Sequence, residues 1–567
     1  MNDGRTNALN GAEAMVRMLD AFEVRHLFGL CGDTTLPFYD ALYRLDHGIN
    51  HILTRDERHA AYMADAYARV TGRVGVCEGP SGGGATYILP GLVEANESSV
   101  PVLAITTDVA VSSAGRYPLT ELRQDELFRP LTKWNSVIDL PSRVPGVVRS
   151  AFRAMTTGRP GAAHIGFPFD VQLGDVAEDD IWAQPEFATY PAWRSGPDPA
   201  AVESAIEMLL NANNPLVICG GGVILSGAEA ALQHLAERLN IIVATTVSGQ
   251  GSLSDNHPNC LGVVGSNGGT LPTRQVVEGA DLIVFVGCRA GSVTTERWRF
   301  PAVGAKIVHI DSDPMVISAN YRTDVALVSD IKLALEAINR ALDDTGTTVA
   351  ERGGHLQVAA AKADKFAPFL KLAASDDRPI KPERVVAELN RVLPDDAIVV
   401  ADPGTPCPYF SAYYDVPIAG RHFISNRAHG ALGYSLAAAI GAQIGRPDAK
   451  VVSVMGDGSF GFSVGELETI TRLGLPITCI VFSNAVYGWI KAGQKSGFDE
   501  RYFSVDFSRS DHAAIAAAFG VKSWRVEDPG DLSRIFAEAI EHGGPTLVDV
   551  ISQPLQDTQA PVSEWVA

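Results

Sequence analysis

The sequence predicts an α/β protein made of three doubly wound parallel-sheet domains in series. Its 567 residues are too many for one hydrophobic core and fit three domains of about 180 residues each. Short apolar runs alternate with amphipathic helical patterns along the chain, which is typical of parallel sheets covered by helices on both faces. Two polar stretches, Ala177–Pro197 and Asp343–Asp376, separate three parts of similar size, and the second stretch is expected to be partly helical.

Each domain is expected to contain several buried strands, because short apolar runs rich in Val and Ile lie between polar residues. The first domain, residues 1–175, has such runs at His26–Leu30, His51–Leu53, Val74–Cys77, Val102–Thr106 and Ala163–Phe167. The second domain, residues 198–345, has them at Leu216–Cys219, Ile241–Ala244, Leu282–Val286 and Ile307–Ile310. The third domain, residues 376–567, has them at Ala397–Ala401, Val451–Met455, Ile477–Phe482 and Thr546–Val550.

Composition argues for a folded protein without a nucleic-acid or membrane partner. The chain has 46 Lys and Arg against 66 Asp and Glu, and the net charge of −20 disfavours binding to nucleic acid or to an anionic membrane. No apolar run reaches the roughly 18 residues of a membrane span, and the polar stretch Met1–Asn10 has no apolar signal core. Seven cysteines without Cys-x-x-Cys spacing are typical of a reducing compartment, so we expect a cytoplasmic protein.

Asp457 and Asn484 form the most informative pair of residues. They are 484 − 457 = 27 positions apart, and each follows a predicted strand, with a helical pattern at Ser463–Leu473 between them. A strand–helix–strand crossover places the carboxyl ends of both strands at one crevice, so the carboxylate and the amide are expected to converge. Hard oxygen ligands beside a Gly-rich turn suit Mg²⁺ bound to phosphate oxygens. The alternative is an ordinary Gly-Asp-Gly turn and an Asn that ends a strand.

The motif Gly456-Asp457-Gly458-Ser459, followed by a helix, a strand and Asn484, resembles the signature of the thiamine-diphosphate-dependent enzymes. Other motifs resemble the acetolactate synthase-like branch of that family. The resemblance implies thiamine diphosphate and Mg²⁺ as cofactors. It implies that the four residues of this motif bind the thiamine diphosphate. It also implies that Asp457, Asn484 and the backbone carbonyl of Val486 bind the metal. The three domains would then be pyrimidine-binding, middle Rossmann-like and diphosphate-binding.

Glu57 resembles the essential glutamate of the family. It lies in Arg55-Asp56-Glu57-Arg58-His59, directly after a predicted strand and at the start of a helix. In the family this carboxyl group hydrogen-bonds a ring nitrogen of the cofactor's aminopyrimidine, so that the exocyclic nitrogen can deprotonate the thiazolium carbon. Otherwise, a Glu at a helix start is only a favourable contact with the helix dipole.

Two further parts of the first domain resemble the family. Arg73–Thr86 is similar to the strand, Gly-rich loop and helix start beside the pyrimidine, although glycines there also suit a tight turn. Gln124 is similar to a glutamine that lines the substrate side, with a different local spacing. It would otherwise be a surface residue.

In the third domain the resemblance assigns further cofactor contacts. Gly404 and Thr405, after a predicted strand, would hold the diphosphate through backbone N–H and a hydroxyl group. The Gly430 carbonyl would accept a hydrogen bond from the aminopyrimidine, and Leu432 would be the apolar wedge that bends the cofactor. His429 would face the reacting carbon and move protons. Otherwise, Leu432 is ordinary core and His429 a structural histidine.

The middle domain leaves the presence of a flavin open. Three of its segments are similar to the family's domain that holds FAD or ADP in some members and nothing in others: Gly220–Val223, Val286–Arg289 and Ile310–Pro314. The domain has no Gly-x-Gly-x-x-Gly fingerprint of a dinucleotide site. The sequence therefore predicts neither the presence nor the absence of FAD.

The resemblance predicts a thiamine-diphosphate- and Mg²⁺-dependent decarboxylating carboligase, which removes carbon dioxide from a 2-oxo acid and transfers the enamine intermediate to a carbonyl acceptor. Gly493 stands where acetolactate synthases usually have a tryptophan that shapes the second-substrate pocket, so the pocket is larger or the acceptor differs. Three alternatives stay open: a non-oxidative decarboxylase that releases an aldehyde, a flavin-dependent oxidative decarboxylase, and a catalytically silent subunit. The resemblance also implies a homodimer or homotetramer with sites between subunits. The donor, the acceptor and any regulatory subunit are left open.

Overall fold

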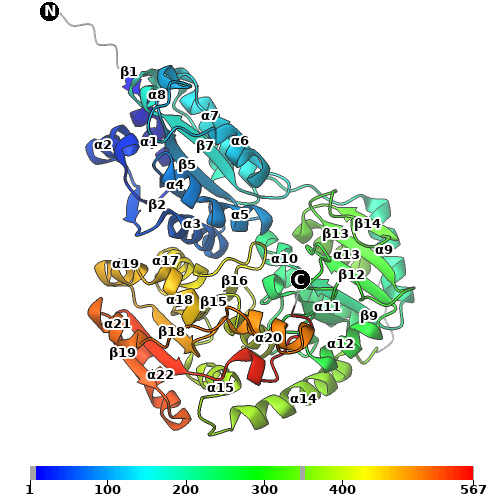
Figure 1. Cartoon of the computed structure of the whole chain (residues 1–567). Coiled ribbons are helices and arrows are strands. Elements are labelled where there is room, and N and C mark those ends of the chain that lie inside the picture. Colours follow the sequence, from blue (N-terminus) through cyan, green and yellow to red (C-terminus); the bar gives the residue numbers. More distant parts are fainter. Residues whose placement is uncertain (1–7, 345–351, 566–567) are drawn as a thin grey trace, which may run out of the picture. The chain divides into compact units, whose positions relative to one another are not determined.

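The chain forms three six-stranded sheets, each with all strands parallel, and one two-stranded antiparallel sheet, over residues 8–344 and 352–565, which the computed structural model describes (Figure 1). Helices separate the strands along the chain. The predicted fold class of three doubly wound parallel sheets in series is therefore confirmed. Every helix in the described ranges is too short or too polar to span a lipid bilayer.

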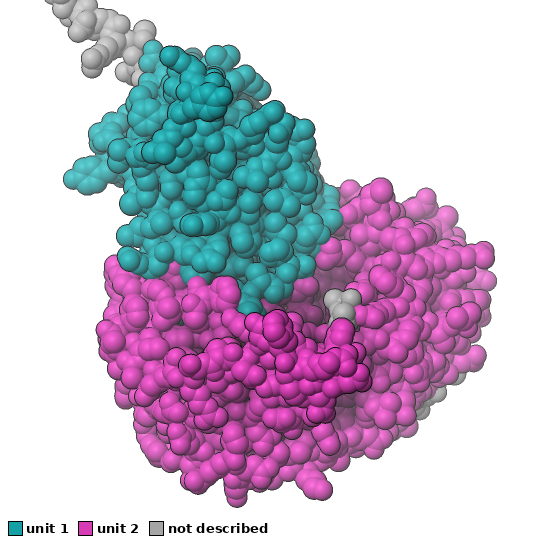
Figure 2. Space-filling model, viewed as in Figure 1, with its two compact units in different colours: residues 1–193, 428–447 teal, residues 194–427, 448–567 magenta. Residues whose placement is uncertain are grey.

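The contacts within the chain divide it into two compact units. Unit 1 consists of Met1–Trp193 and Ala428–Pro447, and unit 2 consists of Arg194–Arg427 and Asp448–Ala567 (Figure 2). The first sheet lies in unit 1, and the second and third sheets lie in unit 2. The strands of the three sheets fall inside the predicted domains 1–175, 198–345 and 376–567. The limits of these domains stay a prediction.

The first sheet has the strand order β3-β2-β4-β5-β7-β6. Its strands are β2 (His26–Gly29), β3 (Asn50–Leu53), β4 (Gly75–Gly79), β5 (Val102–Asp108), β6 (Trp134–Val137) and β7 (Ala163–Pro168). The helices of its layers are α1 (Gly11–Ala21), α2 (Leu36–Arg44), α3 (Glu57–Thr71), α4 (Gly83–Tyr87), α5 (Leu89–Glu97), α6 (Gln124–Phe128), α7 (Val144–Thr156) and α8 (Phe169–Leu173). The short strands β1 (Ala8–Asn10) and β8 (Asp175–Ala177) pair antiparallel.

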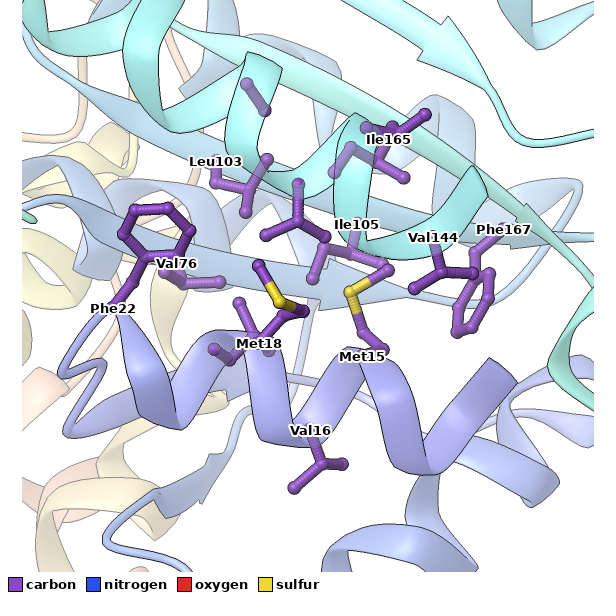
Figure 3. Close-up of a cluster of buried hydrophobic side chains, with 14 of the residues drawn as sticks. Met15, Val16, Met18, Phe22, Val76, Leu103, Ile105, Val144, Ile165 and Phe167 are labelled. Carbon is purple, nitrogen blue, oxygen red and sulfur yellow. The ribbon is translucent and has the colours of Figure 1, made fainter. Parts of the chain in front are cut away.

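The core of unit 1 forms where α1 covers the first sheet. Met15 and Met18 recur at helical spacing, so they share one face of α1 and project toward Leu103 and Ile105 of β5 (Figure 3). All four side chains are fully buried. The start of α1 is fixed by a capping box, in which the Asn10 side chain accepts from the N–H of Glu13 and the Glu13 carboxylate accepts from the N–H of Asn10.

The second sheet has the order β11-β10-β9-β12-β13-β14. Its strands are β9 (Pro215–Cys219), β10 (Ile242–Thr245), β11 (Cys260–Val263), β12 (Leu282–Val286), β13 (Lys306–Asp311) and β14 (Val325–Val328). The helices are α9 (Pro199–Asn211), α10 (Gly222–Ser226), α11 (Glu229–Leu239), α12 (Leu271–Glu278) and α13 (Ile331–Asp344). The long helix α14 (Gly354–Ala373) follows, and it confirms the helical character of the predicted connector.

The third sheet has the order β16-β15-β17-β18-β20-β19. Its strands are β15 (Ile398–Ala401), β16 (Phe423–Ser425), β17 (Val451–Gly456), β18 (Thr478–Ser483), β19 (Lys522–Val526) and β20 (Thr546–Ile551). The helices in this part of the chain are α15 (Pro382–Val392), α16 (Pro406–Tyr413), α17 (Tyr434–Gly445), α18 (Asp457–Ser463), α19 (Glu466–Leu473), α20 (Gly488–Gly497), α21 (His512–Ala518) and α22 (Leu532–Glu541).

Two features of the local structure differ from the prediction. The five strands of the parallel sheets that lie outside the predicted set, β6, β11, β14, β16 and β19, are all edge strands. Of these, β6 and β19 carry polar residues, so they lack the continuous apolar run that marks a central strand. The strands β11, β14 and β16 are only three or four residues long. The helical pattern predicted at Ser463–Leu473 belongs to two helices, because α18 already begins at Asp457.

Helix α17 packs closely along α3 within unit 1. A Cβ on Gly441 would lie 2.0 Å from the backbone oxygen of Met63, so this crossing has room only for a glycine. At the start of the contact the rings of Tyr62 and Tyr434 meet edge to face, 5.1 Å between centroids. The small residues of α17 therefore set the distance between the two helices.

We expect Gly441→Ala to destabilise the protein by about 1–3 kcal/mol, because the added methyl group overpacks the contact with α3. Gly146→Ala in α7 is the matched control, since only the Arg149 side chain comes within 4 Å of its Cβ position. The control should be neutral or slightly stabilising, because alanine is the better helix former. Chemical denaturation of both variants measures the difference, and equal stabilities would contradict the packing argument.

Candidate active site

The structure brings Asp457 to the backbone of Asn484. β17 and β18 are neighbouring parallel strands with Gly456 opposite Phe482, and Asp457 directly follows β17. One carboxylate oxygen of Asp457 accepts from the N–H groups of Asn484 at 2.7 Å and Ala485 at 2.6 Å, and the other accepts from Gly458 at 2.9 Å. The crossover therefore places the acid and the asparagine at the same edge of the sheet.

Burial and hydrogen bonding act in opposite directions on Asp457. Its side chain is 6% exposed, and this burial raises the pKa, while the three backbone N–H groups stabilise the charged form. Ala485 has a positive φ of 60°, which is strained for a residue with a Cβ. The hydrogen bond from the Ala485 N–H to Asp457 holds the chain in this conformation.

The residues around Asp457 fit a magnesium ion that also binds an anionic ligand. The Nδ2 of Asn484 is buried and has no hydrogen-bond partner among the described residues, so this N–H donor is left for an anionic ligand. Val486, the third predicted ligand, is buried and follows two residues later. In residues 8–344 and 352–565, no group of three or more His, Cys, Asp and Glu side chains could hold a metal. A metal here would depend on carboxylate, amide and carbonyl oxygens, which suit Mg²⁺.

Glycines open space at this edge of the third sheet. Gly404 follows β15 with a φ of 101°, and at both Gly404 and Gly456 no atom lies within 4 Å of a Cβ position. Thr405 is buried, and its hydroxyl lies 3.5 Å from the Cβ position of Gly488, where α20 begins. The loops after β15, β17 and β18 therefore border this open space, which we call the cradle. Ser459, in the first turn of α18, is buried beside it.

A buried polar cluster behind Asn484 was not found by sequence reasoning. The Nδ1 of His512 lies 3.2 Å from the Ser483 hydroxyl and 3.1 Å from a carboxylate oxygen of Asp549, and all three side chains are buried. The cluster joins the last residue of β18 to α21 and β20. No local pattern marks these residues, because the three positions are far apart in the sequence.

Glu57 is the first residue of α3 in unit 1. The N-cap Asp56 accepts from the N–H of Arg58 at 2.8 Å, so the helix starts at the predicted position. The Glu57 side chain is 6% exposed, and its Cγ lies 3.3 Å from the Cβ position of Gly79. Burial, then the charges of Asp56 and Glu78, raise the pKa of Glu57. The carboxyl group is therefore suited to keep its proton.

The Gly-rich segment after β4 lies directly against Glu57. One carboxylate oxygen of Glu57 is 3.1 Å from the Cβ position of Gly84, so a side chain there would displace the acid. Gly82 has a φ of 67°, and its Cβ position is 2.8 Å from Thr120. These glycines are needed for close approach as well as for the turn.

Gln124 is buried at 1% exposure, so the alternative of a surface glutamine is wrong. Its Oε1 accepts from the Thr106 hydroxyl at 2.5 Å, and its Nε2 donates to the backbone oxygen of Thr107 at 2.9 Å. The Thr106 hydroxyl also lies 2.6 Å from Nε2 of His164, and burial lowers the pKa of His164 to about 3. A neutral histidine thus completes the network that orients the Gln124 amide. A role on the substrate side stays a prediction.

The segment with His429, Gly430 and Leu432 is anchored within unit 1. The N–H groups of Ala428 and His429 donate to Glu94 at 3.2 and 2.7 Å. His429 and Gly430 are exposed, Leu432 is half-buried, and Gly430 has a φ of 71°. The segment is therefore fixed at its start, while the three predicted residues are accessible.

The anchor of this segment is a buried charge network. Arg69 of α3 donates to Asp65 at 2.8 Å and to Glu94 at 3.1 Å, and the Tyr434 hydroxyl donates to Asp65 at 2.5 Å. The Arg69, Asp65 and Glu94 side chains are at most 5% exposed. Helix α3 thus carries Glu57 at its start and, in its middle, holds the segment before α17.

In the middle domain the glycines serve backbone packing. A Cβ on Gly220 would lie 2.1 Å from the oxygen of Gly287, and one on Gly222 would lie 2.7 Å from the Gly287 Cα. The turns after β9 and β12 therefore touch through their main chains. Whether this domain holds FAD stays open.

Three family profiles match the chain. The profile "Thiamine pyrophosphate enzyme, N-terminal TPP binding domain" matches residues 9–127, the "central domain" profile matches residues 202–338, and the "C-terminal TPP binding domain" profile matches residues 402–550. Thiamine pyrophosphate (TPP) is another name for thiamine diphosphate.

Several known proteins are similar to the chain over nearly its full length. A probable acetolactate synthase large subunit of Methanococcus aeolicus is 36% identical, and the match covers 96% of this chain and 92% of the relative. A probable acetolactate synthase large subunit of Methanocaldococcus jannaschii is 35% identical, with 97% and 93% covered. An acetolactate synthase of Arthrospira platensis is 31% identical, with 96% and 94% covered.

We expect Arg69→Leu to destabilise the protein by about 3–5 kcal/mol, because it leaves Asp65 and Glu94 buried without their counter-charge. Arg143→Leu is the control, since it breaks an exposed ion pair with Asp139 and should cost about 0–1 kcal/mol. Urea unfolding of both variants gives the comparison. An equally small effect in both variants would show that the charge network around Arg69 does not hold the segment that contains His429, Gly430 and Leu432.

Proposed function

Because this chain belongs to the thiamine-diphosphate-dependent enzymes, in the acetolactate synthase-like branch, we propose that it is a Mg²⁺-dependent decarboxylating carboligase that joins a 2-oxo acid to a carbonyl acceptor. Thiamine-diphosphate-dependent carboligation of a 2-oxo acid follows from the domain matches and the full-length relatives. The metal ion, the acceptor and the roles of individual residues are the proposal. The observation that carries it is Glu57, a buried acid with a raised pKa at the start of α3.

Asp457, Asn484 and the carbonyl of Val486 are proposed to bind Mg²⁺ together with diphosphate oxygens. The support for the metal is the set of oxygen atoms beside Asp457, and the support for the diphosphate is the unpaired Nδ2 of Asn484. The rest of the cradle is proposed to bind the diphosphate through backbone N–H and hydroxyl groups, from Gly404, Thr405, Gly456, Gly458 and Ser459.

Glu57 is proposed to donate its proton to a ring nitrogen of the cofactor. When bound, thiamine diphosphate supplies a carbon nucleophile and an electron sink for the departing carboxylate. Gly430 is proposed to accept a hydrogen bond through its carbonyl, and Leu432 to press on the cofactor as an apolar wedge. His429 and Gln124 are proposed to exchange protons with the substrate and to orient it.

The acceptor is proposed to differ from that of typical acetolactate synthases. Gly493 lies in α20, and its Cβ position is 3.7 Å from the Cβ of Trp565. The rings of Trp489 and Trp565 meet edge to face, 5.1 Å apart. An aromatic pair thus lies against the side of α20 where the tryptophan of the relatives would be attached, which favours another shape of acceptor.

We also propose a homodimer or homotetramer in the cytoplasm, with active sites between subunits, as the family resemblance implies. We propose Mg²⁺ as a cofactor as well, and the middle domain as the place of FAD if the protein binds it. A purified protein with flavin absorbance that consumes oxygen would favour oxidative decarboxylation instead. A colourless protein that releases carbon dioxide without oxygen would exclude it.

A panel of 2-oxo acids, with and without aldehyde and 2-oxo acid acceptors, tests the proposed function. We expect carbon dioxide release that requires both thiamine diphosphate and Mg²⁺, and a coupled product when the right acceptor is present. Carbon dioxide release with only a free aldehyde as product would identify a simple decarboxylase. No turnover with any member of the panel would contradict the carboligase proposal.

Glu57→Gln is expected to bind the cofactor but to lower turnover by about 10²–10⁴-fold, because the amide cannot supply the proton. Exchange of the thiazolium proton, followed by NMR, should slow in parallel. Glu126→Gln is the control, since this carboxylate is half exposed and pairs with Arg123. Normal turnover in Glu57→Gln would defeat the proposed role.

Asp457→Ala is expected to lose binding of thiamine diphosphate and Mg²⁺, because it removes the only charged ligand and frees the strained Ala485. Isothermal titration calorimetry measures the loss. Asp499→Ala should bind as the wild type does, since Asp499 is 88% exposed and pairs with Arg501. Unchanged affinity in Asp457→Ala would show that the cofactor binds elsewhere.

A further inference from the structure

A second buried carboxyl group, that of Glu78, lies at the same edge of the first sheet as Glu57. Glu78 is on β4, next to Gly79, whose Cβ position is 3.3 Å from the Cγ of Glu57. Side chains alternate across a strand, so the two acids lie on either side of the β4 backbone at its carboxyl end. Glu78 is 1% exposed and Glu57 is 6% exposed.

The carboxyl group of Glu78 reaches across β2 to Tyr39 and His51. One of its oxygens accepts from the Tyr39 hydroxyl at 2.5 Å and lies 3.2 Å from Nε2 of His51. Position 29 has to be glycine, because a Cβ there would lie 1.9 Å from the same oxygen. The other oxygen is buried and has no hydrogen-bond partner among the described residues.

The negative charge of Glu78 has no Lys or Arg beside it to balance it. Asp56 also faces Glu57, but the Arg58 guanidinium holds Asp56 through hydrogen bonds of 2.6–3.1 Å and offsets its charge. No Lys or Arg in the described part of the chain forms an ion pair with Glu57 or Glu78; His51 alone does so with Glu78. Of the other titratable groups, Tyr39 and Cys77 lie close to Glu78, and Cys31 lies close to Tyr39.

The two acids are expected to titrate together. Burial raises the pKa of both, and the charge of Glu78 raises that of Glu57 further. Like charges in a buried site disfavour double ionisation, so a charged Glu78 favours the protonated form of Glu57. His51 has 21% of its side chain exposed and lies 3.0 Å from the Tyr39 hydroxyl, so the hydrogen-bond network of Glu78 reaches water.

We propose that Glu78, held by Tyr39 and His51, is a positioning residue for the proton of Glu57: the two acids keep one proton between them at neutral pH, and Glu57 remains a hydrogen-bond donor. The inference rests on the proposed function, in which Glu57 donates to the cofactor. It concerns only groups of the chain itself, so it can be measured without the cofactor.

Infrared difference spectroscopy of the cofactor-free, full-length protein tests the proposal. The carbonyl band of a protonated carboxyl group that is lost in Glu57→Gln belongs to Glu57. The intensity of this band over a pH series gives the titration midpoint of Glu57. Glu78→Gln keeps the shape and the bond from Tyr39 but removes the charge, so the midpoint of Glu57 should fall to lower pH. Glu23→Gln, which removes an exposed carboxylate paired with Arg73, should leave it unchanged.

An unchanged Glu57 midpoint in Glu78→Gln would overturn the proposal. Should this variant fail to fold, Tyr39→Phe replaces it. Loss of the hydroxyl makes Glu78 hold a proton more tightly, so this variant should also lower the Glu57 midpoint, and an unchanged value would again overturn the proposal. The proposed function fails by a different result, normal turnover of Glu57→Gln, so the two failures are distinguishable.

Discussion

Two backbone N–H groups, those of Asn484 and Ala485, converge on one carboxylate oxygen of Asp457, and the candidate active site of unit 2 depends on this contact. Pairing of β17 with β18 fixes the register of the strands but not the course of the chain beyond them. Asp457 fixes the course of the chain after β18 by accepting from the strained residue Ala485, and Val486 follows Ala485 directly. One buried carboxylate therefore arranges all three candidate ligands.

In unit 1 a single helix has the corresponding role. α3 presents Glu57 at its first residue, where the helix dipole and burial act on the carboxyl group in opposite directions. Two turns later, Asp65 and Arg69 hold Tyr434 and the segment before it. Because the reactive end and the anchoring end belong to one rigid element, a change in the packing of α3 affects both.

Sequence reasoning succeeded where function or structure leaves a local pattern. Central strands were found because they are buried on both faces, and the spacing of Asp457 and Asn484 was informative because one crossover joins them. Edge strands such as β19, with the sequence Lys-Ser-Trp-Arg-Val, were missed because half of their residues face water. His512 and Glu78 were missed for another reason. Their partners come from distant strands and helices, so only the folded chain shows what they contact.

The segment that contains α17 belongs to unit 1 although more than 230 residues separate it from the rest of that unit. A gene fragment that stops near residue 193 would therefore produce a unit with one helix missing and with the face of α3 that packs against α17 exposed. Such a fragment would be prone to aggregate unless α17 were supplied as a separate peptide. Recombination between relatives is limited in the same way. Exchange of the amino-terminal third alone would pair α3 of one protein with α17 of another, although the two helices pack closely at Gly441.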